Sequence, residues 1–147
     1  MKWKIIFVSA FLLFATGSTF AQTKNQPKSI INKSALIKKY YDQKELIGMQ
    51  KGDLVELCIE RVAVLVKTIP YVALATKPGV TMSDLGIPNN PEYRKALESQ
   101  EEATNGYLET TTEFQTKILP YSDKDDLISA ILFYESILKS LHELKEM

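Results

Sequence analysis

The chain has 147 residues, with 18 basic and 18 acidic side chains, one Cys and one His. This balanced charge lacks the basic surface that is typical of nucleic-acid-binding proteins, and one Cys cannot form an intrachain disulfide. The length suits one domain whose stability comes from a hydrophobic core.

The N-terminal end has the pattern of a cleaved signal peptide over residues 1–21. Lys2 and Lys4 precede an apolar stretch, and Thr19 and Ala21 form the small-x-small site that signal peptidases cut. This start resembles signals of Gram-negative bacteria and predicts a product in the periplasm or outside the cell. The alternative is an uncleaved membrane anchor, for which the apolar stretch is short. Cleavage after Ala21 removes two of the 18 basic residues and none of the 18 acidic ones, so the net charge becomes −2.

The next two segments predict a leader and a first helix. Residues 22–28 are polar, contain a Pro and predict a flexible leader. Residues 29–49 predict a helix, because Ile30, Ile37 and Tyr41 share one side at 100° per residue.

The second predicted helix begins at Asp53 and is apolar on nearly every side, as expected of a helix that others surround. Cys58 shares its apolar stripe with Leu54, which predicts a small buried side chain and not a reactive thiol. Pro70 predicts a kink, with the helix continuing to about Ala75.

The third predicted helix has a strong start signal, with Asn90 as N-cap and Pro91 in the first helical position. It extends to about Leu119. Gly106 and the run of Thr at 110–112 lower its intrinsic helix propensity near the middle. One face carries its apolar residues, which are Tyr93, Ala96, Leu97, Ala103, Tyr107, Leu108, Phe114 and Ile118.

The fourth predicted helix follows Pro120, with Ser122 and Asp125 as a capping pattern, and extends nearly to Met147. Four helices joined by short connections, with one long loop between the second and third, predict an all-α fold. The expected architecture is an up-down four-helix bundle over residues 29–147.

The sequence lacks the common motifs of cofactor and metal sites. It has no glycine-rich phosphate loop, no CxxCH haem site, no paired Cys and His of a zinc site and no ferritin-type Glu-x-x-His pair. Residues 122–126 lack the Gly and the final Glu of a calcium loop. We therefore expect no cofactor, no metal and no catalytic residue.

Two charged residues interrupt apolar helix faces, Arg61 in the second helix and Glu135 in the fourth. His142 lies seven residues after Glu135, on the same face. One interpretation is a structural ion pair between Arg61 and Glu135 with an exposed His142. The other is a polar pocket inside the bundle, in which Arg61 binds an anion beside Glu135 and His142.

The loop between the second and third helices is long and carries several apolar residues. We expect Val80, Leu85 and Ile87 to cover the end of the bundle. Loops on rigid scaffolds also carry binding sites, so the loop is alternatively a recognition element made by Met82, Leu85, Ile87 and Tyr93, with Met82 and Tyr93 outermost.

These features together predict a small exported protein that acts by binding another protein, such as an inhibitor, an immunity factor or an envelope accessory subunit. The near-neutral charge and the lack of a cationic run argue against nucleic acid and, after cleavage, against membrane as partners. One alternative is a small-ligand carrier with a polar pocket inside the bundle, and a further alternative is an enzyme of an unrecognised class.

Overall fold

The computed structural model describes residues 27–144, so the predicted signal peptide and most of the leader lie outside the described residues. The fold is all-α: the described residues contain no strand, and one isolated antiparallel bridge joins Ser29 to Thr81. The helices are α2 (Gln43–Gly48), α3 (Lys51–Thr68), α4 (Pro91–Ile118) and α5 (Lys124–Glu143). Four 3-10 turns accompany them, η1 (Lys33–Ala35), η2 (Ile69–Tyr71), η3 (Ser83–Leu85) and η4 (Leu119–Tyr121).

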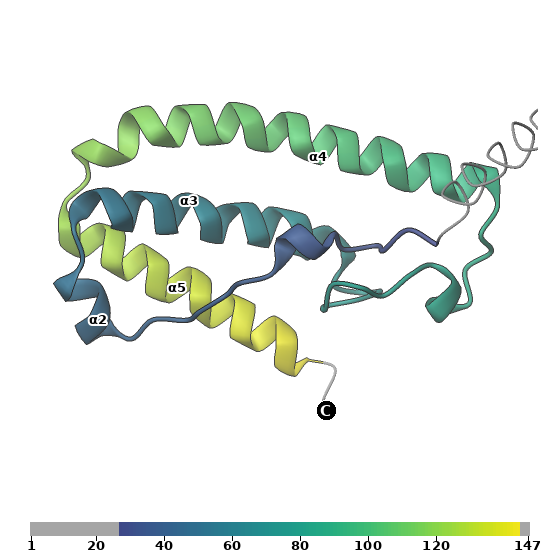
Figure 1. Cartoon of the computed structure of the whole chain (residues 1–147), viewed down its shortest axis with the longest axis horizontal. Helices are drawn as coiled ribbons and strands as arrows, with labels where there is room; N and C mark the ends of the chain where they lie inside the picture. The colour runs from purple at the N-terminus through teal and green to yellow at the C-terminus, as the bar shows by residue number, and fades with distance from the viewer. Residues whose placement is uncertain (1–26, 145–147) are drawn as a thin grey trace, which may run out of the picture.

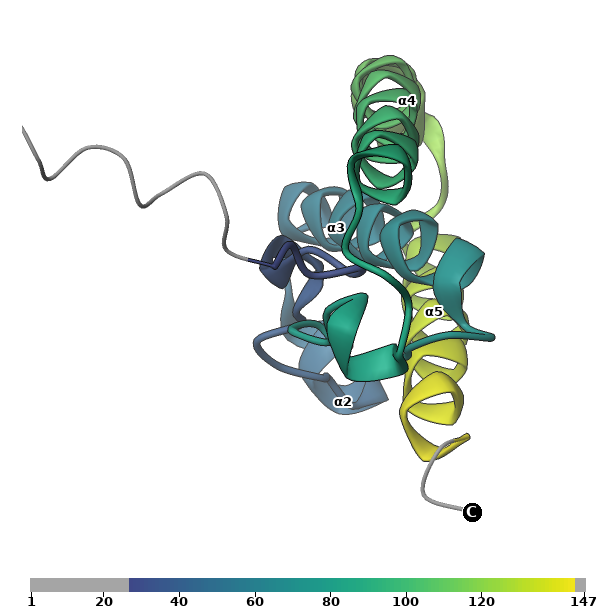
Figure 2. The same cartoon turned by 90° about the vertical axis from the view of Figure 1, so that its right-hand side faces the viewer.

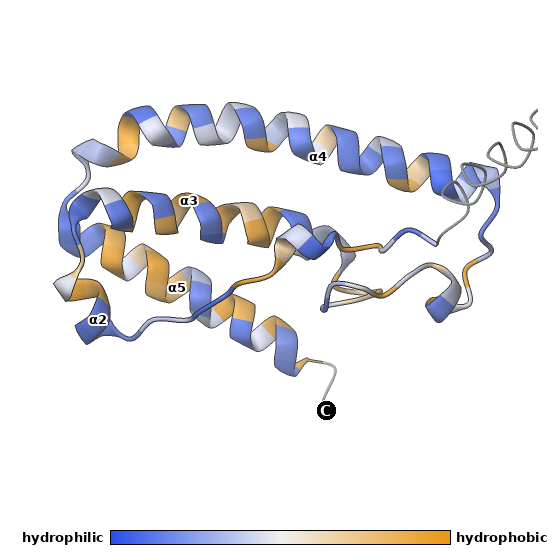
Figure 3. Cartoon of the chain, viewed as in Figure 1, coloured by the Kyte–Doolittle hydropathy of each residue, from blue (hydrophilic) through white to orange (hydrophobic). Residues whose placement is uncertain are grey.

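Helix α3 lies at the centre of the molecule (Figure 1). Helix α4 lies along one side of α3, and α5 packs across the opposite side. The N-terminal segment, residues 28–42, passes on a third side of α3, together with the loop 72–90 (Figure 2). Apolar residues are dense on α3 and α5, whereas α4 is largely hydrophilic (Figure 3). No described helix is both long enough and apolar enough to cross a membrane.

The predicted first helix over residues 29–49 is wrong, since this region is extended apart from η1 and the six-residue helix α2. Helix α2 begins where a capping box permits it: Asp42 accepts from the Glu45 amide at 2.8 Å, and Glu45 accepts from the Asp42 amide at 3.0 Å. Before that point, the backbone bonds to distant groups, as when the Ile30 amide donates to the Val80 carbonyl at 2.8 Å. Three long helices and an extended segment therefore occupy residues 27–144, and an up-down four-helix bundle is not confirmed.

Helix α3 agrees with the prediction in its position and burial. It begins at Lys51, two residues before the expected start, and Leu54 and Cys58 are buried. The expected continuation to about Ala75 is wrong, because the α-helix ends at Thr68 and Pro70 lies in the 3-10 turn η2. Proline cannot donate a backbone hydrogen bond, so the chain turns here instead of continuing the helix.

Helix α4 begins as predicted, with Pro91 in the first position and the Asn90 side chain accepting from the Tyr93 amide at 2.9 Å. It ends at Ile118, one residue before the expected end, and leads into the 3-10 turn η4. The predicted cap of the last helix differs, since Asp123, and not Ser122, is the N-cap residue of α5, without a side-chain capping bond.

The buried apolar residues form two clusters along α3 and α5. One surrounds Leu46 of α2 and includes Cys58 and Ile131. The other includes residues of the N-terminal segment and the loop, with Leu65 and Leu138. In both helices, the charged residues Arg61 and Glu135 fall between the positions that supply the two clusters.

The docking of α2 makes a direct prediction. Leu46 is fully buried, whereas its neighbour Ile47 is 56% exposed. We expect Leu46→Ala to lower the free energy of unfolding by about 2–5 kcal/mol, because it leaves a cavity in the core.

Urea denaturation measures this difference. The matched control Ile47→Ala removes a side chain of the same composition from the same helix and should change stability by less than about 1 kcal/mol. Equal effects of the two variants would contradict the docking of α2.

Candidate functional site

The centre of the molecule contains a direct ion pair between Arg61 of α3 and Glu135 of α5. Nε and Nη2 of Arg61 donate to Glu135 Oε1 at 3.0 and 2.7 Å. Both residues are only 1% exposed. The structure thus brings together two residues that are 74 positions apart in the sequence.

The pair also bonds to the backbone of the N-terminal segment and to the side chain of Glu60. Nη2 of Arg61 also donates to the Lys39 carbonyl at 2.7 Å, and Glu135 Oε2 accepts from the Tyr41 amide at 3.0 Å. Nη1 of Arg61 donates to Glu60 at 2.5 Å. Each nitrogen of the guanidinium therefore has a partner within the chain, and the arrangement is suited to joining three segments rather than to binding an external anion.

His142 does not join the ion pair. It is half-buried near the end of α5, where its Nδ1 lies 3.5 Å from the hydroxyl of Tyr40. Burial, and then the negative charge of Glu135, raise the pKa of Tyr40 above its usual value. This contact places a second residue of the N-terminal segment against α5.

The loop expected to carry recognition residues is mostly turned inward. Met82 was expected to be outermost, but it is only 6% exposed and belongs to the core. Leu85 and Ile87 are half-buried against the same cluster. Tyr93 is 43% exposed, and it lies in the first turn of α4 and not in the loop. Burying an apolar side chain lowers the free energy of the folded chain, which explains why Met82 points inward.

Cys58 is buried, as the apolar stripe predicted. Burial raises the pKa of its thiol to about 11, and the nearby Arg61 only partly opposes this effect. Its Sγ donates to the Leu127 carbonyl at 3.6 Å. Because the thiolate is the reactive form, this thiol is a poor nucleophile at neutral pH.

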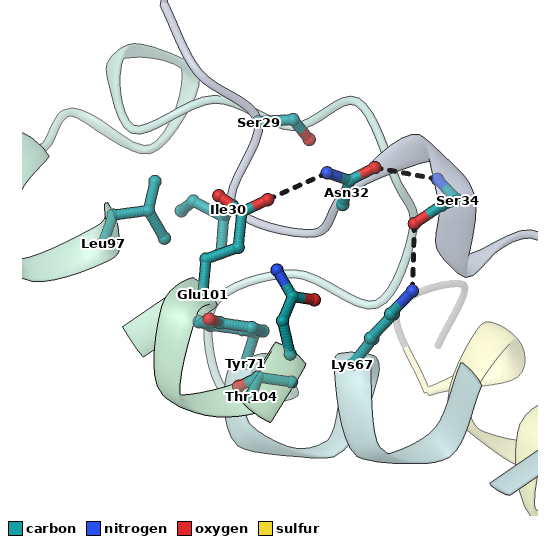
Figure 4. Close-up of a pocket in the computed structure, with 10 residues that line it drawn as sticks. Ser29, Ile30, Asn32, Ser34, Lys67, Tyr71, Leu97, Glu101 and Thr104 are labelled. Carbon is teal, nitrogen blue, oxygen red and sulfur yellow. Dashed lines mark hydrogen bonds between the residues drawn. The ribbon is translucent and has the colours of Figure 1, made fainter. Parts of the chain in front are cut away.

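A cavity of about 340 Å³ lies between the N-terminal segment, the end of α3 and α4 (Figure 4). Asn32 connects two of its walls, donating to Glu101 at 3.0 Å and accepting from the Ser34 amide at 2.9 Å. Lys67 donates to the Ser34 hydroxyl at 3.2 Å. The other lining residues are Ser29, Ile30, Tyr71, Leu97, Thr104 and Asn105.

Glu101 is the acidic group of this cavity, and its charge is balanced from within the chain. It forms an ion pair with Lys28, the last residue of the predicted leader. The hydrogen bond from Lys28 lowers the pKa of Glu101, and burial partly opposes this shift. The cavity therefore has a polar wall, on which Lys28 balances the charge of Glu101, and an apolar part made by Ile30 and Leu97.

Helix α4 presents a second candidate surface. Within this helix, all of which the structure describes, the single buried residue is Leu108. Tyr107 is 58% exposed, Phe114 61% and Ile118 48%. With Tyr93, these residues fall within about 60° of one another at 100° per residue. They form the exposed apolar side of α4, whose centre is rotated by about 90° from the buried Leu108.

Comparison with protein-family models, characterised proteins and solved structures finds no match to this chain. The chemistry of the residues themselves must therefore indicate the function. No group of three or more His, Cys, Asp or Glu in the described part of the chain is arranged to hold a metal ion.

Sequence reasoning placed all the apolar residues of α4 on one face, but the structure divides them, since Leu108 is buried whereas Tyr107 and Phe114 are exposed. It also missed the cavity residues Asn32, Lys67 and Glu101. They come from three segments that meet only because the N-terminal segment is extended, and no local pattern in the sequence signals that meeting.

The ion pair predicts strong coupling between its two members. Arg61→Leu and Glu135→Leu should each cost about 3–5 kcal/mol, because each leaves an unpaired buried charge. The double variant should cost clearly less than the sum of the two. Urea denaturation of the four proteins gives the coupling free energy.

Glu60→Leu is the matched control. Glu60 also contacts Arg61, but its side chain is 44% exposed, so its removal should cost less than about 1 kcal/mol. Additive effects of the Arg61 and Glu135 substitutions would show that the pair does not stabilise the fold as a unit.

Proposed function

We propose that this chain is a small, exported, non-catalytic protein that acts by binding another protein molecule. The contact surface in this proposal is the exposed apolar side of α4. The observation that supports it is the exposure of Tyr107, Phe114 and Ile118 along a helix whose opposite side is charged. Inhibitors, immunity factors and envelope accessory subunits are the classes that fit such a protein.

Aromatic residues favour this use of the surface. Tyr and Phe are enriched in the cores of protein interfaces, where they bury a large area at a small cost in side-chain entropy. A scattered exposed apolar residue is ordinary, but a row of them along one helix indicates a contact surface. Tyr121, in the turn that follows α4, is also exposed, at 86%.

The weak burial of α4 within the chain gives further support. A helix of 28 residues normally gains most of its stability from packing an amphipathic face. Here the buried part is Leu108, while Gly106 and the Thr run at 110–112 lower the helix propensity. A partner that covers the apolar side would supply the missing packing.

A photo-crosslinking experiment tests this proposal. A benzoyl-phenylalanine introduced at Tyr107, in the cells that produce the protein, should form a discrete covalent adduct with its binding partner. The matched control carries the same analogue at Glu109, which is exposed on the opposite side of the same helix. Absence of an adduct at Tyr107, or equal adducts at both positions, would contradict binding through this surface.

Small-ligand binding is a second candidate function, favoured by the cavity of Figure 4. Its volume of about 340 Å³ lies within the range of about 300–1,000 Å³ that is usual for ligand sites. Its mixed lining would suit a small polar molecule with an apolar part. In this proposal, the ligand site is separate from the pair of Arg61 and Glu135, whose polar atoms are already bonded within the chain.

Native mass spectrometry can test the ligand proposal. Protein purified from its own cells should carry a small molecule that is lost in Thr104→Trp, because the indole would fill the cavity. Ser99→Trp, on an exposed position of the same helix, should retain it. If each of the three proteins has only the mass of its own polypeptide, with no bound molecule, this function is ruled out.

A further inference from the structure

The cavity of Figure 4 carries a positive charge that the described residues do not neutralise. Two of its lining residues are charged, Lys67 of α3 and Glu101 of α4. Glu101 forms its ion pair with Lys28, so these three side chains contribute two positive charges and one negative charge. The net charge of +1 favours a ligand with one negative charge.

Lys67 is the residue that is available to bind this charge. Its Nζ donates to the Ser34 hydroxyl at 3.2 Å, and this neutral group is its partner within the described residues. An ammonium group has three donors, so two of them remain for a ligand. The pKa of Glu101 is lowered mainly by the hydrogen bond from Lys28, and the charge of Lys67 is the smallest of the causes. Lys67 therefore does not form an ion pair with Glu101.

Two further donors line the same cavity, the hydroxyl of Tyr71 and the side-chain amide of Asn105. Neither forms a hydrogen bond with another side chain in the described part of the chain. Burial, and then the negative charge of Glu101, raise the pKa of Tyr71 above its usual value, so its hydroxyl keeps its proton at neutral pH. The cavity thus offers several donors of the kind that carboxylate oxygens accept.

The remaining part of the cavity suits an apolar group of limited size. Ile30 is buried in the hydrophobic core, and Leu97 packs against the same cluster. A water molecule occupies about 30 Å³ in the liquid, so the cavity volume of about 340 Å³ corresponds to roughly 11 waters. A ligand of about ten non-hydrogen atoms would fill this space.

We propose that the cavity binds a small monocarboxylate, with its carboxylate on Lys67 and its apolar chain or ring against Ile30 and Leu97. A ligand with two negative charges is disfavoured, because Glu101 would repel the second charge. A cationic ligand is disfavoured by Lys67. This inference rests on the ligand-binding candidate function, for which it names the class of ligand, and it is independent of the apolar side of α4.

Titration with small acids tests the inference. Phenylacetate and hexanoate are added to the purified ¹⁵N-labelled protein, and the NMR chemical shifts give the Kd and the location of the bound acid. We expect the largest shifts at the amides of Lys67, Tyr71 and Thr104. The alcohols 2-phenylethanol and 1-hexanol have the same carbon skeletons without the charge, so they should bind about tenfold more weakly or not at all. The cation 2-phenylethylamine should not bind.

Substitutions of lysine separate the charge from the shape of the cavity. Lys67→Met keeps a long apolar side chain but should weaken the binding of both acids about tenfold or more. Lys67→Arg keeps the charge and should retain binding. The matched control is Lys51→Met, at an exposed position of α3 outside the cavity, which should leave the Kd unchanged.

Removal of the acidic group should have the opposite effect. Glu101→Gln leaves Lys28 and Lys67 without a negative charge between them, while the new amide oxygen can still accept from Asn32. This variant should bind phenylacetate more tightly than the wild type does. It should also bind phenyl phosphate, which carries a second negative charge and should not bind to the wild type.

Failure of both acids to bind would overturn the inference, as would equal Kd values for an acid and its alcohol, or an unchanged Kd in Lys67→Met. If protein from its own cells carries a neutral or cationic molecule that Thr104→Trp loses, the ligand-binding function stands and the carboxylate class is excluded. If no molecule is carried and neither acid binds, both proposals fail.

Discussion

The buried ion pair of Arg61 and Glu135 is the constraint on which the arrangement of the chain depends. Removing two charged groups from water costs several kcal/mol for each unless their atoms are bonded. The pair alone cannot satisfy both groups, because the guanidinium has five donors and the carboxylate two oxygens. The Lys39 carbonyl and the Tyr41 amide provide the missing partners. The extended N-terminal segment therefore supplies hydrogen bonds that the buried charged pair needs.

This requirement explains why α4 is left with so little buried surface. The N-terminal segment occupies one side of α3, and α5 supplies Glu135 from another (Figure 2). Helix α4 contacts what remains of α3, and Leu108 is its buried residue in the structure. Because the N-terminal segment and α5 cover the other sides of α3, an apolar side of α4 stays exposed. This side is available for binding.

Local signals in the sequence were sufficient for the elements whose ends are determined locally. Asn90 and Pro91 identified the start of α4, and the continuous apolar residues around Cys58 identified the central helix. The region 29–49 could not be predicted in the same way. Its apolar spacing resembles a helix, but the partners that hold it extended are Val80, Arg61 and Glu135, all distant in sequence. The burial of Met82 and the cavity around Glu101 depend on the same distant contacts.

Hydrogen exchange at the Tyr41 amide tests the central claim most directly, because this amide donates to Glu135 and belongs to a segment without regular secondary structure at that point. If the ion pair holds the segment in place, the Tyr41 amide should exchange as slowly as the amides in the middle of α3, such as that of Cys58. Exchange of the Tyr41 amide at the rate of an unstructured chain, with α3 still protected, would show that the segment is not held by the pair.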